Sequence, residues 1–376
     1  MAAVPPVSHV AYTDIFMPHA VSPKPRLSLA YALALYLLGT DPSFARENEQ
    51  MTPRVNASLQ PCGFQMTRRR AVGRPSDAGI DRFGVRKLYP TAGGGRVWFL
   101  PDNAETKSAE WDPDGATKVG DGFHNHGQVR MTVKSPMGSA WWRNVEMTGY
   151  VRYLRELIED ASQRPHWEWH ARGERHTSNI VIDGAEYNDR VPAPNGTVTP
   201  PGYSFYKDQA SLNAHCLGTA YHGNLYPPYQ ATPSYPAAPA TRALIEKEIS
   251  HTAGYTKPNP ECAVDGRLKN GRLGDGWFGL KVVIRNFAEN HSVKTELWLD
   301  REANNNWSLL EVKDDTGNWF ADPLRPNAPI DGCENPPFNY ETFQVLTWAA
   351  PWVTFRSDNV DWDLKSLSVR EISPLP

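Results

Sequence analysis

The fold is decided by WFGLKVVIR, residues 277–285, where apolar side chains recur at every second position from Phe278 to Ile284. Because successive side chains of a strand point to opposite faces, this alternation predicts a β-strand with one buried face. VKTELWLD, residues 293–300, repeats the pattern, and the Asn-rich DREANNN that follows has the composition of a turn. Residues 307–314 then return as the partner strand, so the pair is predicted to form a hairpin.

The other predicted strands show the same alternation or a short apolar run. They lie at residues 97–100, 129–134, 144–151, 166–170, 343–350, 352–357 and 364–372. Leu154, Leu157 and Ile158 have helical spacing, so a short helix is expected there. Residues 241–251 fit either a strand or a helix. Many short strands with turns between them argue for a β-sandwich or a β-barrel.

The composition is that of a folded protein with many loops. Hydrophobic residues make up 40% of the 376 residues, which is enough for a sizeable core, and 33 Pro with 28 Gly indicate frequent turns. The net charge of −3 leaves no basic surplus, which argues against nucleic acid or an anionic membrane as partner. The 13 Trp and 15 Tyr suit a core, and they also suit stacking against sugar rings.

The N-terminal residues have the pattern of an export signal. Lys24 and Arg26 precede the apolar run LSLAYALALYLL, residues 27–38, and small residues follow at 43–45. The run is too short to span a bilayer, so we expect a secreted protein with no membrane attachment after signal cleavage. A start at Met17 would give a signal peptide of ordinary length. The expected organisation is an N-terminal extension and signal peptide in residues 1–45, a linker in 46–80 and one domain in 81–376.

The four cysteines, Cys62, Cys216, Cys262 and Cys333, are spaced too widely for a zinc motif. In an exported protein they predict one or two disulfides, and three full pairings are open. Because Cys62 falls in the expected linker, a single bridge among the other three is open as well.

Several stretches together resemble a known architecture. They are GWFGLKVV (276–283), LWLD (297–300) with the Asn-rich turn and Trp307, VTFR (353–356), LSVREI (367–372) and WRNVEMTGY (142–150). They resemble the concanavalin-A-like lectin/glucanase jelly roll, and within it the secreted polysaccharide lyases of the alginate-lyase and glucuronan-lyase type. The resemblance extends over residues 81–372 and implies an all-β fold, a jelly-roll sandwich of two antiparallel sheets.

The same resemblance carries expectations about partners and cofactors. It implies an anionic polysaccharide as partner, no required cofactor and room for a structural calcium ion. The Arg-x-Glu-Leu-Arg and Gln-Ile-His motifs of the alginate lyases are absent from this sequence. The catalytic residues of those enzymes therefore do not carry over, and candidates have to come from residue chemistry.

Lyase chemistry on a uronic-acid polymer needs three kinds of group. A cation neutralises the C5 carboxylate, a base removes the C5 proton and an acid protonates the departing O4. Arg suits the first role through its bidentate fork, and His or Tyr suits the other two. The candidate catalytic residues are Arg172, Arg175, His176, Tyr221 and His222. The candidate substrate-binding residues are Lys247, Glu248, His251, Lys281 and Arg285.

Two other functions fit the same sequence. A non-catalytic carbohydrate-binding or surface protein would account for the many aromatic residues and the missing lyase motifs. A glycoside hydrolase needs two carboxylates about 5–9 Å apart. Glu296, Asp300 and Glu302 have even spacing but the surroundings of solvated turn residues, and Glu174 with Glu248 is a second pair.

No metal centre is predicted. His124 and His126 lie two residues apart, but spacing places no third ligand beside them. Oxygen-bearing side chains alternate from Asp300 to Asn306 as in a calcium loop, yet the Gly and the closing Glu of an EF-hand loop are missing. A hairpin turn is therefore the prediction for that segment.

Overall fold

A computed structural model gives the fold of the second of two units of the chain, Ser58–Pro376. The residues that it describes are 62, 78–100, 109–112, 117–119, 122–134, 141–157, 164–172, 219–232, 235–249, 262–264, 276–319, 328–330, 333, 339–350 and 352–376. No helix occurs within these ranges. Among the same residues there is accordingly no helical segment that could cross a membrane.

All regular elements in the described ranges are β-strands, as the alternating pattern predicted. They are β1 (Val97–Phe99), β2 (Ala109–Asp112), β3 (Thr117–Val119), β4 (Gly122–Lys134), β5 (Val145–Glu156), β6 (His166–Ala171), β7 (Ala220–Tyr226), β8 (Arg242–Glu248), β9 (Cys262–Ala263), β10 (Trp277–Asn286), β11 (Val293–Asp300), β12 (Ser308–Asp315) and β13 (Trp352–Glu371). Every pairing between them is antiparallel, in the order β12-β11-β10-β5-β13-β6-β7-β8-β9, with β4 beside β13 and β1, β2 and β3 off this path.

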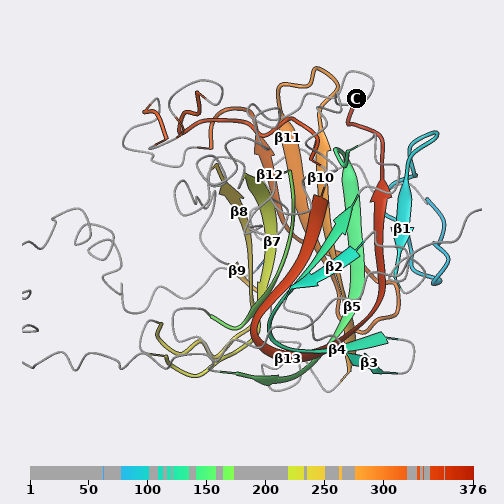
Figure 1. Cartoon of the computed structure of the whole chain (residues 1–376), viewed down its shortest axis with the longest axis vertical. Coiled ribbons are helices and arrows are strands. Elements are labelled where there is room, and N and C mark those ends of the chain that lie inside the picture. The colour runs from blue at the N-terminus through green and yellow to red at the C-terminus, as the bar shows by residue number, and fades with distance from the viewer. Residues whose placement is uncertain are drawn as a thin grey trace, which may run out of the picture. The chain divides into compact units, whose positions relative to one another are not determined.

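The long strand β13 folds this sheet into two layers. Residues 353–358 pair with β6, and residues 360–371 pair with β5. Between these two stretches, from Ser357 to Val360, the pairing of β13 with β4 shifts its register. Figure 1 shows β13 in red, curving between the two halves. We call β5, β10, β11, β12 and the second half of β13 layer A, and β6, β7, β8, β9 and the first half of β13 layer B.

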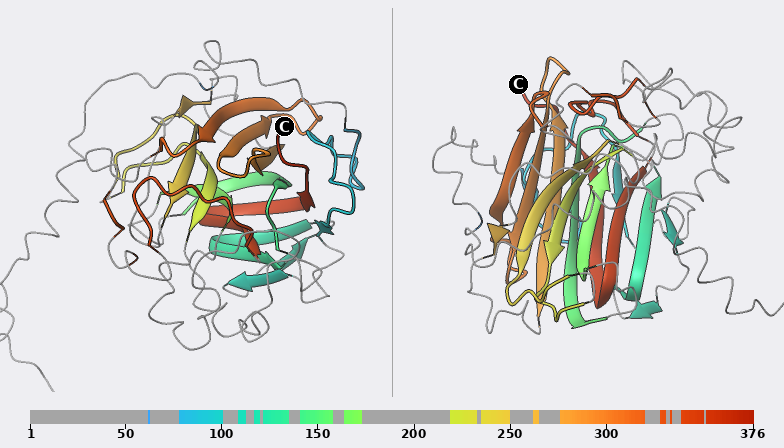
Figure 2. Two further views of the ribbon diagram at one scale, coloured as in Figure 1. Left: turned by 90° about the horizontal axis from the view of Figure 1, so that it is seen from above. Right: turned by 90° about the vertical axis from the view of Figure 1, so that its left-hand side faces the viewer.

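The two layers stack face to face. Strands β10, β11 and β12 of layer A contact β6, β7 and β8 of layer B without pairing their backbones in a ladder, and Figure 2 shows the layers from two further sides. Fully buried Trp167 and Trp169 of β6 fill the space between them. At Gly223 of β7 an added Cβ would lie 2.5 Å from Val282 Cγ2 of β10, so glycine is needed for the layers to approach. The protein is therefore an all-β jelly-roll sandwich, as expected.

The outer face of layer A is covered by the chain segment that precedes β1. Leu88 and Tyr89 pack against Trp298 and other apolar side chains of that face. Their backbone N–H groups donate to the buried carboxylate of Glu146 at 3.1–3.2 Å. Lys281 Nζ lies 2.8 Å from the same carboxylate, and Arg370 contributes a second cation. This charged cluster is satisfied within the fold.

Some local predictions were wrong. Strand β5 continues to Glu156, so the helix expected around Leu154 is absent there and Leu154 is left exposed. Residues 343–350 form no strand and make only isolated bridges such as Ala350 with Trp142. The strands predicted at 352–357 and 364–372 are one strand, β13. The ambiguous residues 241–251 contain a strand, β8.

Disulfide bonds connect distant parts of the unit. Cys62 is bonded to Cys262 of β9, so a residue of the expected linker is tied covalently to the edge of layer B. Cys333 is also disulfide-bonded. The expected domain bounds at residues 45 and 80 stay predictions, because the first of them lies outside the described residues.

Candidate functional site

Layer B presents a polar surface on the side away from the core, which we call the polar face. On β6, alternation sends Trp167 and Trp169 inward, so His166, Glu168 and His170 lie on the other side. The neighbouring strands add polar groups to the same side. The members of the polar face are Thr354, Arg356 and Asp358 of β13, His166, Glu168 and His170 of β6, His222 and Asn224 of β7, and Glu246 and Glu248 of β8. All of them are buried.

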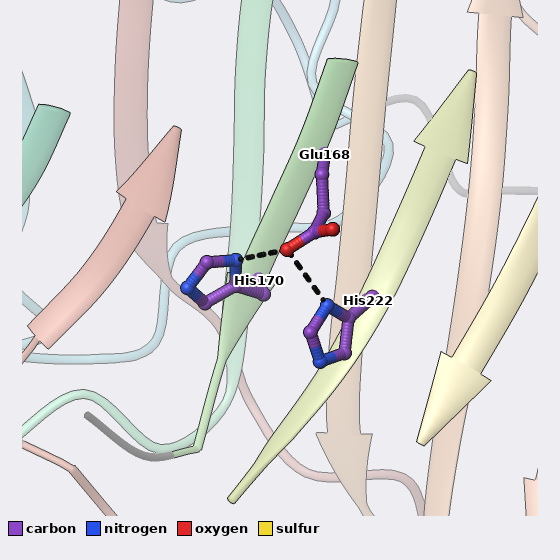
Figure 3. A group of neighbouring side chains, drawn as sticks. All are labelled: Glu168, His170 and His222. Carbon is purple, nitrogen blue, oxygen red and sulfur yellow. Dashed lines mark ion pairs between the residues drawn. The ribbon is translucent and has the colours of Figure 1, made fainter. Parts of the chain in front are cut away.

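At the centre of the polar face, two imidazoles converge on one carboxylate. His170 and His222 are direct partners across β6 and β7. Their Nδ1 atoms lie 3.2 Å and 3.0 Å from Oε1 of Glu168, as Figure 3 shows. We call these three residues the Glu168 centre.

Further charged groups surround the Glu168 centre. Nε2 of His222 lies 3.4 Å from Oε2 of Glu248, and Nε2 of His166 lies 3.3 Å from Oε2 of Glu168. Arg356 Nη1 lies 3.7 Å from Oε1 of Glu168, and its Nε lies 2.7 Å from Asp358. Burial alone would lower the pKa of Arg356, but Glu168 and Asp358 outweigh it and raise the pKa above its ordinary value.

One end of the polar face carries aromatic rings interleaved with arginines. Tyr226 stacks on His166 with ring centroids 5.1 Å apart. The Arg164 guanidinium lies 4.1 Å from the centroid of the Tyr226 ring and 5.4 Å from that of Tyr235. Arg242 approaches the rings of Tyr226 and Tyr229. We call Arg164, Tyr226, Tyr229, Tyr235 and Arg242 the tyrosine end.

Of the candidates from the sequence, His222 and Glu248 lie on the polar face. Tyr221 and Lys247 are their neighbours in β7 and β8, and therefore point to the other side, between the layers. There Tyr221 Oη donates to Asp315 at 2.6 Å and Lys247 Nζ lies 2.8 Å from the same carboxylate. Burial and the charge of Asp315 raise the pKa of Tyr221. Within this fold Tyr221 and His222 do not share one site.

Arg172 follows β6 and is fully buried, with a φ of 88°. Its guanidinium donates to the carbonyl oxygens of Thr347 and Trp348 at 3.1 Å and 2.7 Å, and to Asn286 Oδ1 at 2.6 Å. Burial and the nearby Arg143 lower its pKa to about 9. These contacts hold the segment before β13 in place and leave the guanidinium engaged away from the Glu168 centre.

Lys281 and Arg285 lie on the outer face of layer A. Lys281 is paired with Glu146, as described above. The Arg285 guanidinium lies 3.7 Å from the Tyr89 ring centroid and 3.7 Å from Glu296 Oε1. The structure thus separates both residues from His222 by the thickness of the sandwich. Arg175, His176 and His251 lie outside the described residues and stay predictions.

The β11 carboxylates that were considered for a hydrolase site are engaged in hydrogen bonds within the fold. Glu296 accepts hydrogen bonds from Tyr89 Oη at 2.7 Å and from Trp298 Nε1 at 3.0 Å, and burial raises its pKa. Asp300 accepts the N–H group of Asn305 at 2.7 Å and Tyr150 Oη at 3.2 Å. Both side chains are fully buried, so their interpretation as solvated turn residues was wrong. Glu174 lies outside the described ranges.

The sequence candidates missed Glu168, His170 and Arg356 as members of one site. A signal was present in HWEWH, residues 166–170, because three polar side chains alternate with two Trp. In a strand, this alternation places all three polar side chains on one face and both Trp side chains on the other. Arg356 could not be added from the sequence, since its pairing opposite Glu168 depends on the β6–β13 register.

Comparisons with known proteins give little beyond a general likeness. No family model matches the sequence, and no curated protein matches it. Among solved structures, a Bacillus subtilis protein of unknown function with a galectin-like fold is 10% identical, with a TM-score of 0.34 over 75% of this chain and 98% of its own. Lectin II from Ulex europaeus is 11% identical, with a TM-score of 0.32 over 73% and 97%. A legume lectin-like domain from Entamoeba histolytica is 7% identical, with a TM-score of 0.34 over 74% and 97%.

Proposed function

We propose that this protein binds a polysaccharide at the tyrosine end of the polar face, as a non-catalytic carbohydrate-binding protein. The observation that carries the proposal is the tyrosine end, where Arg164 and Arg242 alternate with tyrosine rings beside a row of buried hydrogen-bonding groups. Tyrosine offers a flat apolar ring with a polar tip, which suits the apolar face and the hydroxyl rim of a sugar. The half-buried guanidinium groups of Arg164 and Arg242 next to it supply hydrogen-bond donors for sugar oxygens.

The arginines favour a sugar that carries carboxylates. A guanidinium presents two parallel N–H donors that match a carboxylate in bidentate geometry. Arg164 and Arg242 are each half-buried, and Nη2 of Arg242 donates to Tyr229 Oη at 2.9 Å, so the rings hold the guanidinium groups in place. We therefore propose an acidic polysaccharide, such as one built from uronic acids, as the ligand of the tyrosine end.

Affinity gels that contain alginate, glucuronan, pectate or a neutral glucan test this proposal. The protein should be retarded by at least one acidic polymer. Arg164→Gln combined with Arg242→Gln should weaken that affinity by about tenfold or more, because charge-assisted hydrogen bonds are lost. Arg152→Gln is the matched control, since Arg152 also lies over an aromatic ring, that of Trp277 at 5.2 Å, but on layer A. Absence of retardation by every polymer would overturn the proposal, as would equal losses in both variants.

A second candidate function is β-elimination at the Glu168 centre. The observation that favours it is the meeting of two imidazoles and the Arg356 guanidinium at one carboxylate. His170 or His222 would take the roles of base and acid, and Arg356 would neutralise the uronate carboxylate. Incubation with alginate, glucuronan and pectate should then raise the ultraviolet absorbance of the new double bond, and His222→Gln should abolish the rise. Binding without any rise would exclude the lyase and leave the binding protein. New reducing ends without unsaturated product would indicate a hydrolase instead.

We propose that the protein is exported. The disulfide between Cys62 and Cys262, with Cys333 also oxidised, supports an oxidising compartment. Mass spectrometry of the protein recovered from the culture medium of its host should show an N-terminus near residue 45. Retention of the full chain inside the cell would contradict this.

A further inference from the structure

We propose that the Glu168 centre binds one divalent transition-metal ion of the Zn²⁺ type. This inference does not depend on the proposed function, because it concerns the three side chains themselves. It goes against the expectation from the sequence, which predicted no metal centre and placed no third ligand beside His124 and His126. The pairing of β6 with β7 supplies that ligand, since it brings His222 opposite His170.

The separations among the three ligand atoms suit a shared ion. Zn–N and Zn–O bonds of about 2.0–2.2 Å, at angles between octahedral and tetrahedral values, place neighbouring ligand atoms about 3.0–3.5 Å apart. The Nδ1 atoms of His170 and His222 lie 3.2 Å and 3.0 Å from Glu168 Oε1. All three ligand atoms lie within 4.8 Å of one another, and in Figure 3 both nitrogens face the same oxygen. An ion can therefore be accommodated with only small side-chain movements.

The donor set selects the class of metal. Two imidazoles and one carboxylate are the ligands of zinc sites that keep a position open for water or substrate. The same set also serves non-haem iron. Ca²⁺ and Mg²⁺ are hard cations that prefer oxygen ligands, whereas two of the three ligand atoms here are imidazole nitrogens. This donor set therefore favours Zn²⁺.

The surroundings orient the ligands as outer groups of metal sites do. Oε2 of Glu248 lies 3.4 Å from Nε2 of His222, which favours the proton on Nε2 and leaves the lone pair on Nδ1 for a metal. Nε2 of His166 lies 3.3 Å from Oε2 of Glu168 and leaves Oε1 directed at the two imidazoles. All three ligands sit on paired strands rather than on loops, so the site is preorganised before an ion arrives.

The charge balance favours a cation at this place. Glu168, Glu246 and Glu248 bring three carboxylates to the centre of the polar face. Arg356 faces them, but it is paired with Asp358 as well. A divalent ion held by Glu168, His170 and His222 would bring two positive charges among these carboxylates.

Metal titration of the full chain tests the proposal. The protein is treated with a chelator, dialysed, and titrated with Zn²⁺ by calorimetry, and the bound metal is counted by mass spectrometry. We expect one tight Zn²⁺ per chain. His170→Gln and His222→Gln should each weaken that site by about a hundredfold or more. Glu248→Gln should weaken it by about tenfold to a hundredfold, because the Glu248 carboxylate orients the His222 ring. His124→Gln is the matched control, because His124 contacts Asp361 and Asp363 on the outer face of layer A.

Cobalt gives a readout that a merely structural role of these histidines would not produce. Co²⁺ in place of Zn²⁺ should show visible d–d absorption of a low-coordinate site with nitrogen and oxygen ligands, and His222→Gln should remove it. Far-ultraviolet circular dichroism on each variant separates loss of a ligand from loss of the fold. Equal Zn²⁺ affinity in wild type, His170→Gln and His222→Gln would overturn the proposal. So would the absence of a tight site in the folded wild type. Neither result bears on polysaccharide retardation, which is measured at the tyrosine end.

Discussion

At the scale of single residues, buried carboxylates decide which charged side chains belong to the fold. Asp315 lies between the layers and binds both Tyr221 and Lys247, while Glu146 under the N-terminal segment binds Lys281 and Arg370. Removal of one partner from such a pair leaves an uncompensated buried charge, which lowers the free energy of unfolding. These pairs therefore stabilise the fold. On the polar face, carboxylates and cationic side chains contact one another across neighbouring strands. The segment before β1 packs on layer A and does not cover them.

Lys247→Met should therefore reduce stability and leave polysaccharide affinity unchanged. Removal of the ammonium group strands Asp315 in the core, which costs about 3–5 kcal/mol in comparable buried pairs. Lys294→Met is the control, because the pair of Lys294 with the half-exposed Asp314 is partly solvated and worth about 0–1 kcal/mol. Urea denaturation of both variants measures the difference. A stable Lys247→Met variant that no longer binds polysaccharide would restore Lys247 as a binding residue.

Glu146 should make stability depend on acid pH. Burial alone would raise its pKa, but Lys281 and Arg370 outweigh burial and hold the pKa below the ordinary value of 4.5. A carboxylate with a depressed pKa stabilises the fold above its unfolded pKa, and that contribution is lost as the pH falls through the folded pKa. Thermal unfolding should show wild type more stable than Glu146→Gln at neutral pH. The difference should shrink as the pH falls below 4.5; a difference that grows there would contradict the assignment.

At the scale of elements, β7 of layer B packs directly against β10 of layer A at Gly223. Gly223→Ala should lower the free energy of unfolding by about 1–3 kcal/mol, because the new methyl group overlaps Val282 and approaches Leu297. Gly276→Ala is the control, since an added Cβ there has no neighbour within 4 Å. Chemical denaturation of the two variants measures both values. Equal effects would mean that the layers are not as close as described.

Strand alternation was sufficient to predict most elements, and its failures have local causes. The hairpin of β11 and β12 was predicted because residues 293–300 alternate and the Asn-rich segment after them has the composition of a turn. β13 was predicted as two strands because its register shift between Ser357 and Val360 interrupts the alternation. The helical spacing at Leu154 was a coincidence. Leu154 lies near the C-terminal end of β5, where it is exposed to solvent. Leu346, Trp348 and Ala349 of the segment 343–350 pack into the hydrophobic core although the segment forms no strand. Their burial therefore does not imply a strand.

At the scale of the whole molecule, the candidate site depends on contacts that sequence order hides. His222 and Glu248 were predicted individually, but Glu168, His222 and Arg356 meet only because β7 and β13 flank β6. Tyr221 was placed with His222 because they are adjacent in the chain, whereas a strand sends them to opposite faces. Lys281 and Arg285 were predicted to bind the same substrate as His222, because the sequence does not say which layer a strand joins.

The bond between Cys62 and Cys262 should contribute to the stability of the whole unit. It closes a loop of 200 residues, for which the loss of unfolded-state entropy is about 5 kcal/mol in the chain-entropy model. The double variant Cys62→Ser with Cys262→Ser should therefore unfold at a lower urea concentration, by about 2–5 kcal/mol. An unchanged midpoint would show that the bond does not constrain the unfolded chain.

We propose that this protein meets its ligand on the outer face of layer B and not on that of layer A. The most direct test of this proposal is the affinity of wild type, Arg164→Gln with Arg242→Gln, and Arg152→Gln for the acidic polymer that retards the wild type. We predict a loss of about tenfold or more in the layer B variant and wild-type affinity in the layer A variant. Wild-type affinity in the layer B variant, with a loss in Arg152→Gln, would place the binding surface on the other side of the sandwich.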